Sequence, residues 1–429
     1  MNTTATVLII VFIALMLLGV PIAFSMMGAT MVGLIVGKFN FIVLASRLFG
    51  GMDSITLLAI PGFLLAGELM CHGGLAARLI NLADKLIGHI RNGLSVVTIV
   101  VGMFFSAMNG VAAATTAAVG ELMIPEMDKR GYDKSYVAAI CSVVGPLGPI
   151  IPPSVIMIIY AVGGGISVGD LFMAGIVPGI LIGVALIVCS YIMTSKMPLQ
   201  VLPRASAKEV WAAFKEGFWA ILTPVIILGG IYGGFCTPTE AAVIAVFYSL
   251  FTGIFIYKEL DWEGIKTCLV KSMESTAMVM IICGAAQGFG WMVTVTNIST
   301  SIAAFVTSIT DNELIILILM EVVLMIIGCF MDTISAVVIF QAVLLPIAKA
   351  IGMDMLQFAA IFIVFVALGN ATPPFGYALF VGSRISGCSL EQISKKILPM
   401  LVACFIVAFI LDFFPILTLG LPTFLNGLR

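Results

Sequence analysis

Long apolar stretches separated by short polar connections dominate the hydrophobic pattern of this chain. A membrane-spanning helix needs about 20 predominantly apolar residues, and nine stretches meet this length. They lie near residues 4–36, 50–71, 134–165, 168–195, 215–235, 239–257, 272–291, 356–386 and 397–417. The first is too long for the apolar core of a signal peptide and follows no basic residues, so we expect it to remain in the mature protein. The pattern predicts an all-α polytopic membrane protein.

Two further apolar stretches do not fit a single crossing. Residues 93–127 and 313–348 would each form a helix of about 50 Å, whereas the hydrocarbon core of a bilayer is about 30 Å thick. Each stretch also carries small and polar residues near its middle, SAMNG at 106–110 and GCFMDT at 328–333. We therefore expect two re-entrant hairpins, each of which enters and leaves the membrane on one side.

Helix-breaking residues recur inside two other stretches, as GPLGPIIPPS at 145–154 and LGNATPPFG at 368–376. Proline lacks an N–H and disfavours helix before it, so carbonyl groups of the preceding turn lose their helical partners. At membrane depth such backbone is tolerated only where it is buried in protein or lines a wet cavity. The sequence therefore predicts two broken helices, over 134–165 and 356–386, that form binding sites for a cation and an anionic substrate. A simple proline kink is the structural alternative, and the recurrence of the breakers at matched positions in both halves argues against it.

The two halves of the chain match at an offset of 221 residues. The double proline at 152–153 aligns with the one at 373–374, and further breakers and small residues align without a gap. Such self-similarity indicates an internal duplication. The predicted organisation is a first repeat at 1–195 with an amphipathic arm helix at 72–92, a linker and connecting span at 196–235, and a second repeat at 236–429.

Charge orients these segments. Only 10% of the residues are charged and 61% are hydrophobic, whereas soluble proteins carry about a quarter charged residues. With a cytoplasmic N-terminus and two re-entrant hairpins, 16 of the 20 lysines and arginines lie in the cytoplasm, as the positive-inside rule requires. The C-terminus is then periplasmic and the repeats are inverted, as in many secondary transporters. The net charge of −2 gives no reason to expect a nucleic-acid partner.

Candidate chemistry lies at the hairpin tips. Asn109 aligns by eye with Asp332, and amides and carboxylates inside a membrane are costly and usually functional. Both types also cap helices well, so a cap on the second helix of each hairpin is the structural alternative. Glu240 in CTPTEAA fits a capping box with Thr237 better than a proton relay. Glu68, Glu121 and Glu321 receive no role.

Other chemistries find no support in the sequence. The nine cysteines are scattered without a Cys-x-x-Cys motif and there are only two histidines, which argues against a zinc or redox site. No phosphate-binding G-x-x-x-x-G-K-[ST] loop occurs, which argues against an ATPase. We expect no enzymatic activity and no cofactor beyond coupling ions.

Taken together, CTPTEAA, the two breaker segments and the two tip motifs resemble the large membrane subunit of tripartite ATP-independent periplasmic (TRAP) transporters over essentially the whole chain. The resemblance implies an elevator-type, sodium-coupled importer in the bacterial inner membrane. It also implies a small four-helix membrane subunit and a periplasmic substrate-binding protein as partners. The substrate would be an organic anion, either sialic acid, which we slightly favour, or a C4-dicarboxylate.

The resemblance also implies site residues. One sodium site would use Ser106, Asn109, Gly110 and carbonyls around Gly145, and the other would use Gly328, Asp332, Thr333, Thr372 and carbonyls around Gly369. Substrate would lie between them, near Pro153, Ser154, Asn370 and Thr372. Two alternatives remain open: a self-sufficient sodium-coupled anion symporter or antiporter, and an ion channel or membrane scaffold. A neighbouring gene for a secreted binding protein would favour the TRAP subunit, whereas a continuous conductance in bilayers would favour the channel.

Overall fold

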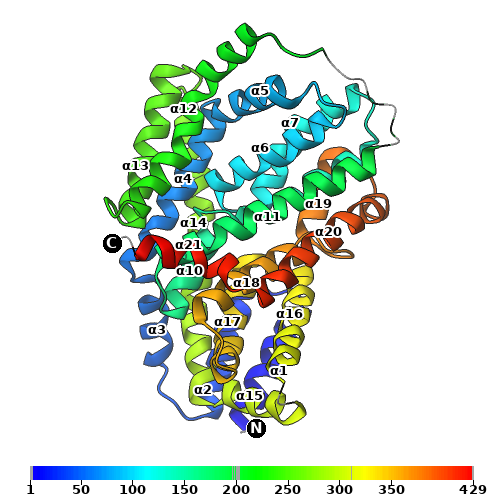
Figure 1. Cartoon of the computed structure of the whole chain (residues 1–429). Helices are drawn as coiled ribbons and strands as arrows, with labels where there is room; N and C mark the ends of the chain where they lie inside the picture. The colour runs from blue at the N-terminus through cyan, green and yellow to red at the C-terminus, as the bar shows by residue number, and fades with distance from the viewer. Residues whose placement is uncertain (1–2, 196, 198, 200–202, 311, 428–429) are drawn as a thin grey trace.

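The structure is a computed structural model that describes residues 3–195, 197, 199, 203–310 and 312–427. Over these residues it contains α-helices, short 3₁₀ and π turns and no strand, which confirms the predicted all-α class. Nine helical segments of the described chain are long and apolar enough to cross a membrane. Figure 1 shows their arrangement.

The helices of the first half have the following bounds: α1 Thr3–Leu17, α2 Ile22–Val36, α3 Ile42–Met52, α4 Ala59–His72, α5 Leu75–Ile87, α6 Gly93–Asn109, α7 Ala112–Lys129, α8 Lys134–Val144, α9 Leu147–Ile150, α10 Val155–Gly164 and α11 Val168–Thr194. Those of the second half are α12 Ala207–Tyr232, α13 Pro238–Phe251, α14 Trp262–Val295, α15 Ile298–Ile309, α16 Glu313–Phe330, α17 Thr333–Ala350, α18 Met355–Gly369, α19 Tyr377–Ser386, α20 Leu390–Phe413 and α21 Ile416–Asn426.

The predicted single span at 4–36 is wrong, because the structure has two helices there. Helix α1 ends at Leu17 and α2 begins at Ile22. Gly19 between them has φ +79°, a left-handed conformation that only glycine adopts readily, and Pro21 has no N–H to continue a helix. The two helices pack side by side against α14, and the N-terminus lies at the same end of the molecule as the start of α3 (Figure 1).

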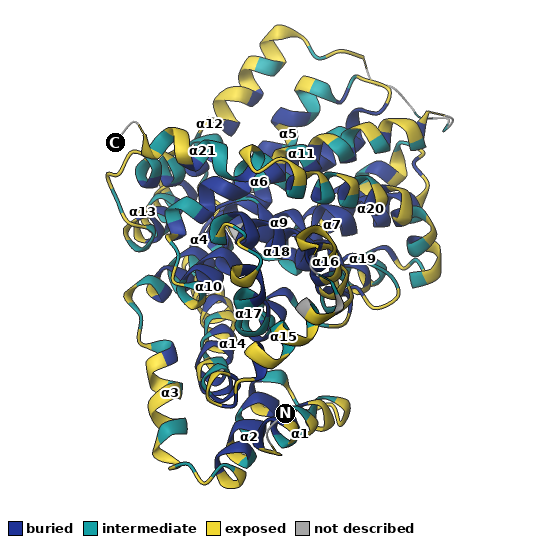
Figure 2. Cartoon of the chain, turned by 60° about the horizontal axis from the view of Figure 1, so that its bottom comes forward, coloured by how far each residue is buried: buried dark blue, intermediate teal, exposed yellow. Residues whose placement is uncertain are grey.

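The centre of the molecule is formed by α8–α10 and α18, and Figure 2 shows the dark blue of buried residues around α9 and α18. Every residue from 357 to 369 is buried, and so are most residues of 134–164. Helices that are apolar on all sides belong in such a position. The rings of Tyr160 and Phe362, one from each broken helix, meet at a centroid distance of 5.2 Å.

The two halves pack crosswise on this centre. Helix α10, after the first break, lies against α17 of the second hairpin, and α19, after the second break, lies against α7 of the first. Gln341 Nε2 on α17 donates to the carbonyl of Tyr160 on α10 at 2.7 Å. This reciprocal packing is compatible with two inverted repeats, and that assignment remains a prediction.

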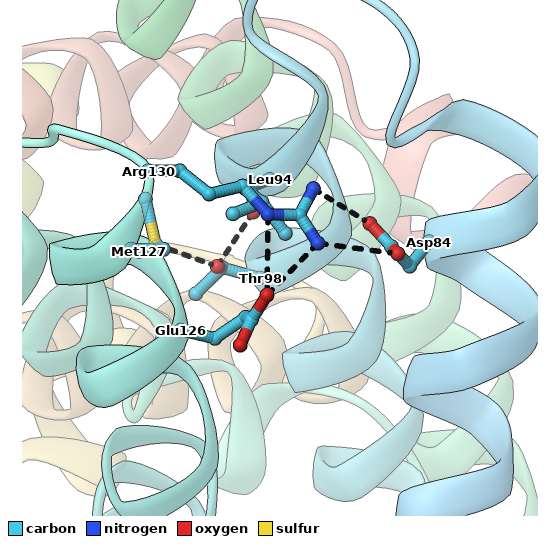
Figure 3. Close-up of polar contacts among 6 residues, drawn as sticks. All are labelled: Asp84, Leu94, Thr98, Glu126, Met127 and Arg130. Atoms are coloured by element: carbon cyan, nitrogen blue, oxygen red, sulfur yellow. Dashed lines mark hydrogen bonds and ion pairs between the residues drawn. The ribbon is translucent and has the colours of Figure 1, made fainter. Parts of the chain in front are cut away.

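A polar cluster joins α5, within the predicted arm at 72–92, to the first hairpin (Figure 3). Arg130, just after α7, donates to Asp84 on α5 at 3.2 and 3.3 Å and to Glu126 on α7 at 3.0 Å. Burial lowers the pKa of the Arg130 guanidinium, but the hydrogen bonds to both carboxylates outweigh this effect and raise its pKa. The end of the hairpin is thus fixed to the arm by a bidentate ion pair.

Candidate functional site

The first broken helix loses its regular hydrogen bonding between α8 and α10. The chain turns through α9 and then runs extended at Ile151 and Ser154. Ser154 begins α10, where its Oγ accepts a hydrogen bond from the N–H of Met157 at 3.4 Å. The peptide bond between Pro152 and Pro153 is cis. All residues of 145–154 are buried except the half-buried Ile151, as irregular backbone in a membrane requires.

The second broken helix is interrupted between α18 and α19. Asn370 follows the end of α18, and Thr372 Oγ1 donates back to the carbonyl of Leu368 at 2.9 Å. The carbonyl of Asn370 accepts the N–H of Ala378 at 2.9 Å, which closes the loop onto the start of α19. The peptide bond between Pro373 and Pro374 is also cis.

The tip of the first hairpin packs onto the first break. Gly110, with φ +65°, joins α6 to α7, and a Cβ placed there would lie 3.0 Å from the Cα of Ser154 and 3.1 Å from the carbonyl oxygen of Pro153. A Cβ on Gly145 would lie 2.8 Å from the carbonyl oxygen of Ala112. Glycine at both positions therefore permits backbone-to-backbone contact between hairpin and break.

The tip of the second hairpin packs onto the second break in the same way. A Cβ on Gly328 would lie 2.4 Å from the carbonyl oxygen of Val366 and 3.0 Å from the Cα of Gly369. Cys329 Sγ donates to the carbonyl of Thr372 at 3.1 Å. The structure thus brings Gly328 together with Gly369 and Thr372, three of the residues predicted for one sodium site.

Three side-chain oxygens on the elements that form the two contacts have no hydrogen-bond partner among the described residues. Ser106 Oγ on α6 and Thr115 Oγ1 on α7 are buried with no hydrogen-bond partner among the described residues, and so is Asn370 Oδ1. The amide of Asn370 is oriented by its Nδ2, which is hydrogen-bonded to Thr333 Oγ1. Neutral oxygens that lack donors suit a hard cation, so these residues fit the predicted ion sites chemically.

Asp332 lies at the N-cap of α17, the second helix of its hairpin. Its carboxylate accepts the N–H of Ser335 at 3.1 Å and the hydroxyl of Ser335 at 2.6 Å. Its capping role is therefore confirmed, and part of its hydrogen-bonding capacity remains for a further ligand.

The alignment of Asn109 with Asp332 is wrong. Asn109 is the last residue of α6, and Val111 holds the N-cap position of α7. Val111 is also the residue 221 positions before Asp332, so the gapless offset gives the correct register. The side chain of Asn109 lies outside the described part of the structure, and its predicted role in the first ion site remains a prediction.

Sequence reasoning missed Thr115. It lies one turn into α7, and its Oγ1 would be 3.2 Å from a Cβ placed on Gly148 in the first break. The two adjacent threonines in VAAATT just after the tip were the available signal. Thr116, the second of them, donates to the carbonyl of Ala112 at 3.0 Å and so differs from the unpartnered Thr115.

The capping box at the start of α13 is confirmed. The N–H of Thr237 donates to Glu240 Oε2 at 2.7 Å, and the N–H of Glu240 donates to Thr237 Oγ1 at 3.3 Å. These reciprocal bonds satisfy two of the free N–H groups of the helix start, with Pro238 at the first position.

A cavity of about 310 Å³ lies away from both breaks, between the α10–α17 pair and helices α3 and α14. Gln287, Trp291 and Gln341 provide polar groups to its wall. The residues that line it include none of the predicted site residues.

The sequence matches the family "Tripartite ATP-independent periplasmic transporter, DctM component" over residues 9–417. The chain belongs to this family. The two hairpin–break contacts are therefore part of a TRAP permease subunit. This result confirms the resemblance carried by the tip and breaker motifs.

Related TRAP permeases differ in the substrates that their names state. The chain is 39% identical to the isethionate TRAP transporter permease protein DctMQ of Oleidesulfovibrio alaskensis over 97% of its own length, and it spans 65% of that protein. It is 36% identical to the sialic acid large permease protein SiaM of Vibrio cholerae, covering 97% of this chain and 98% of SiaM. It is 39% identical to the C4-dicarboxylate large permease protein DctM of Pseudomonas aeruginosa, covering 89% of this chain and 90% of DctM.

Solved structures share the fold of this TRAP permease at low sequence identity. The YdaH transporter of Alcanivorax borkumensis matches with a TM-score of 0.62 and 14% identity over 86% of each chain. MtrF of Neisseria gonorrhoeae matches with a TM-score of 0.59 and 12% identity over 86% of this chain and 82% of MtrF. The similarity concerns the fold alone.

Proposed function

We propose that this TRAP permease imports a small organic anion by a sodium-coupled elevator mechanism. Sialic acid and C4-dicarboxylates are the first substrates to test, followed by isethionate, because relatives of 36–39% identity carry these names. Sodium binds at the two contacts between hairpin tip and helix break, and the anion binds between them, near Ser154, Asn370 and Thr372.

The observation that carries this proposal is a set of three buried side-chain oxygens, on the elements that form the two contacts, that have no hydrogen-bond partner among the described residues. Ser106, Thr115 and Asn370 each bury an oxygen for which the described residues offer no donor. A desolvated acceptor of this kind is costly unless something donates to it or coordinates it. A sodium ion would satisfy several such oxygens at once, together with backbone carbonyls freed by the prolines.

The partners proposed for this chain are a small membrane subunit and a periplasmic substrate-binding protein. The names of several relatives distinguish a large permease protein, which implies a smaller counterpart. The family description includes the words tripartite and periplasmic, which support a soluble component outside the inner membrane.

The orientation that we propose keeps the arm α5 in the cytoplasm, where basic residues accumulate. Because α1 and α2 form a pair, the N-terminus lies on the same side as Lys38, and charge places that side in the periplasm. This revises the expected cytoplasmic N-terminus. The count of basic residues is unaffected, because residues 1–37 contain none.

Uptake into proteoliposomes tests the proposal. The permease is reconstituted with its small subunit, and a radiolabelled acid and its binding protein are added outside under an inward sodium gradient. We expect accumulation that requires both the sodium gradient and the binding protein. Full uptake driven by a proton gradient in sodium-free buffer would contradict sodium coupling.

Two further outcomes would favour the alternatives. Uptake at the same rate without the binding protein would indicate a self-sufficient symporter or antiporter. A continuous ionic current across a planar bilayer would indicate a channel.

A further inference from the structure

Two acidic residues lie inside apolar helices, far along the chain from one another. Glu321 in α16 is completely buried, and neither of its carboxyl oxygens has a hydrogen-bond donor among the described residues. Asp412 is the last residue but one of α20, and both of its carboxyl oxygens are also buried without a donor. Ionisable groups inside a membrane are expensive and usually functional.

The two carboxyl groups interact with each other through their side chains. Two ionised carboxylates offer only acceptors, so a hydrogen bond between them exists only when one of them carries a proton. None of their four oxygens has another donor among the described residues. This observation and the interaction of the two side chains both indicate that a proton is shared between them. A proton is the missing partner.

Among the described residues, no ion pair involves Glu321 or Asp412. Each carboxyl group interacts with the other and with no further titratable group of the described chain. Helix α18, which packs against both α16 and α20, carries no titratable residue. Lys395 and Lys396 on α20 form ion pairs with Glu391 and Asp133. Further titratable residues lie on α16 and α20, at the start of α17, and on the helices packed against α16 and α20, namely α8, α11, α17 and α19. They are Glu313, Cys329, Asp332, Lys349, Lys134, Tyr136, Cys141, Asp170, Cys189, Tyr191, Tyr377, Arg384 and Cys404.

We propose that Glu321 and Asp412 form a proton-binding site that links hairpin helix α16 to helix α20. One carboxyl group donates its O–H to the other, and this charge-assisted hydrogen bond removes one of two negative charges from an apolar interior. The proton comes from water, and no covalent bond between heavy atoms forms or breaks.

Infrared difference spectroscopy of the complete permease in lipid vesicles tests for this proton directly. At neutral pH and without sodium, the wild type should show the C=O absorption of a protonated carboxylic acid, and this absorption should shift in D2O. The double variant Glu321→Gln, Asp412→Asn should lose it. The matched control Glu313→Gln, an exposed acid on the same helix, should retain it.

Three results would overturn the proposal. They are absence of the absorption in the wild type, its persistence in the double variant, and its disappearance from the wild type when sodium is added. The last would identify sodium as the occupant. None of these readouts depends on transport, so the proton site can fail while the proposed sodium-coupled uptake stands, and the reverse.

Thermal unfolding keeps the test decisive if the double variant does not fold. Glu321→Gln supplies an amide N–H that donates to Asp412 without a titratable proton. Raising the pH should lower the melting temperature of the wild type by more than that of Glu321→Gln, because loss of the shared proton leaves two charges in contact. An equal fall in both proteins would contradict the site.

Discussion

Single residues decide how closely each hairpin approaches its helix break. Gly328 meets backbone atoms of Val366 and Gly369, which cannot move aside as a flexible side chain would. Asp332, four residues later, caps α17 with its carboxylate, which accepts the N–H of Ser335 at 3.1 Å. At this scale a methyl group or one charge is enough to change the contact.

Gly328→Ala should destabilise the permease by about 1–3 kcal/mol, the usual range for overpacking, and reduce uptake. Gly229→Ala is the matched control, since a Cβ on this glycine of α12 would meet nothing within 4 Å. Helix propensity predicts a gain of up to about 1 kcal/mol for that variant. Thermal unfolding of purified protein measures both changes, and equal stability of the two variants would refute the close contact.

Asp332→Asn should preserve folding, because asparagine caps a helix about as well as aspartate. It should raise the sodium concentration for half-maximal uptake, because it removes the negative charge that Asp332 supplies at the start of α17. No lysine or arginine lies between residues 312 and 348 to act as its partner. An unchanged sodium dependence with normal stability would leave Asp332 as a cap alone.

At the scale of helices, ion pairs outside the apolar core connect elements that are distant in sequence. Lys396 on α20 lies 2.9 Å from Asp133, which caps the start of α8. Burial raises the pKa of the Asp133 carboxyl, but hydrogen bonds from Lys396 and Ser135 outweigh this effect and hold the pKa below its ordinary value. The pair fastens α20 to the entrance of the first broken helix.

Asp133→Asn should lower the melting temperature at pH 7 and lower it less at about pH 3, below the ordinary pKa of aspartate. The sign follows from linkage: a pKa depressed in the folded state stabilises above the unfolded value, and the effect is lost as pH falls through the folded value. The difference in melting temperature from wild type at the two pH values is the measurement. Lys395→Met is the control, because Lys395 pairs within its own helix.

Sequence patterns predicted elements where their residues act locally. The two double prolines mark where the helices of 134–164 and 355–386 are interrupted, and CTPTEAA contains its whole capping box. The break at Gly19 and Pro21 was missed because the flanking apolar residues resemble one long span. The contact of Glu321 with Asp412 was beyond reach, since it joins residues 91 positions apart and follows no helical period.

At the scale of the whole molecule, the fold places α5 and the N-terminus at opposite ends (Figure 1). The pairing of α1 with α2 brings Thr3 and Lys38 to one end, and both residues are exposed. Labelling reagents applied from one side of the membrane at a few positions can therefore establish the orientation of the entire chain.

Single cysteines in a background without the nine native cysteines should divide into two groups when labelled in intact cells. We expect periplasmic labelling at positions 3, 38 and 312 and cytoplasmic labelling at position 90. A membrane-impermeant maleimide, applied before and after permeabilisation, distinguishes the sides. Labelling of 90 and 312 from one side would refute the inverted arrangement, and labelling of 3 and 38 from opposite sides would refute the α1–α2 pair.

The 34 residues of α14 have a consequence for the surrounding lipid. Such a helix is about 51 Å long, but its four charged residues all precede residue 275, and the uncharged part from 275 to 295 measures about 31 Å. The length of this part matches the thickness of an average hydrocarbon core, so the first turns of α14 lie outside the hydrocarbon core. Helix α14 contacts α2, α3, α4 and α17. A bilayer thinner or thicker than this part of α14 would tilt the helix, and the tilt would shift α17 of the second hairpin through their contact.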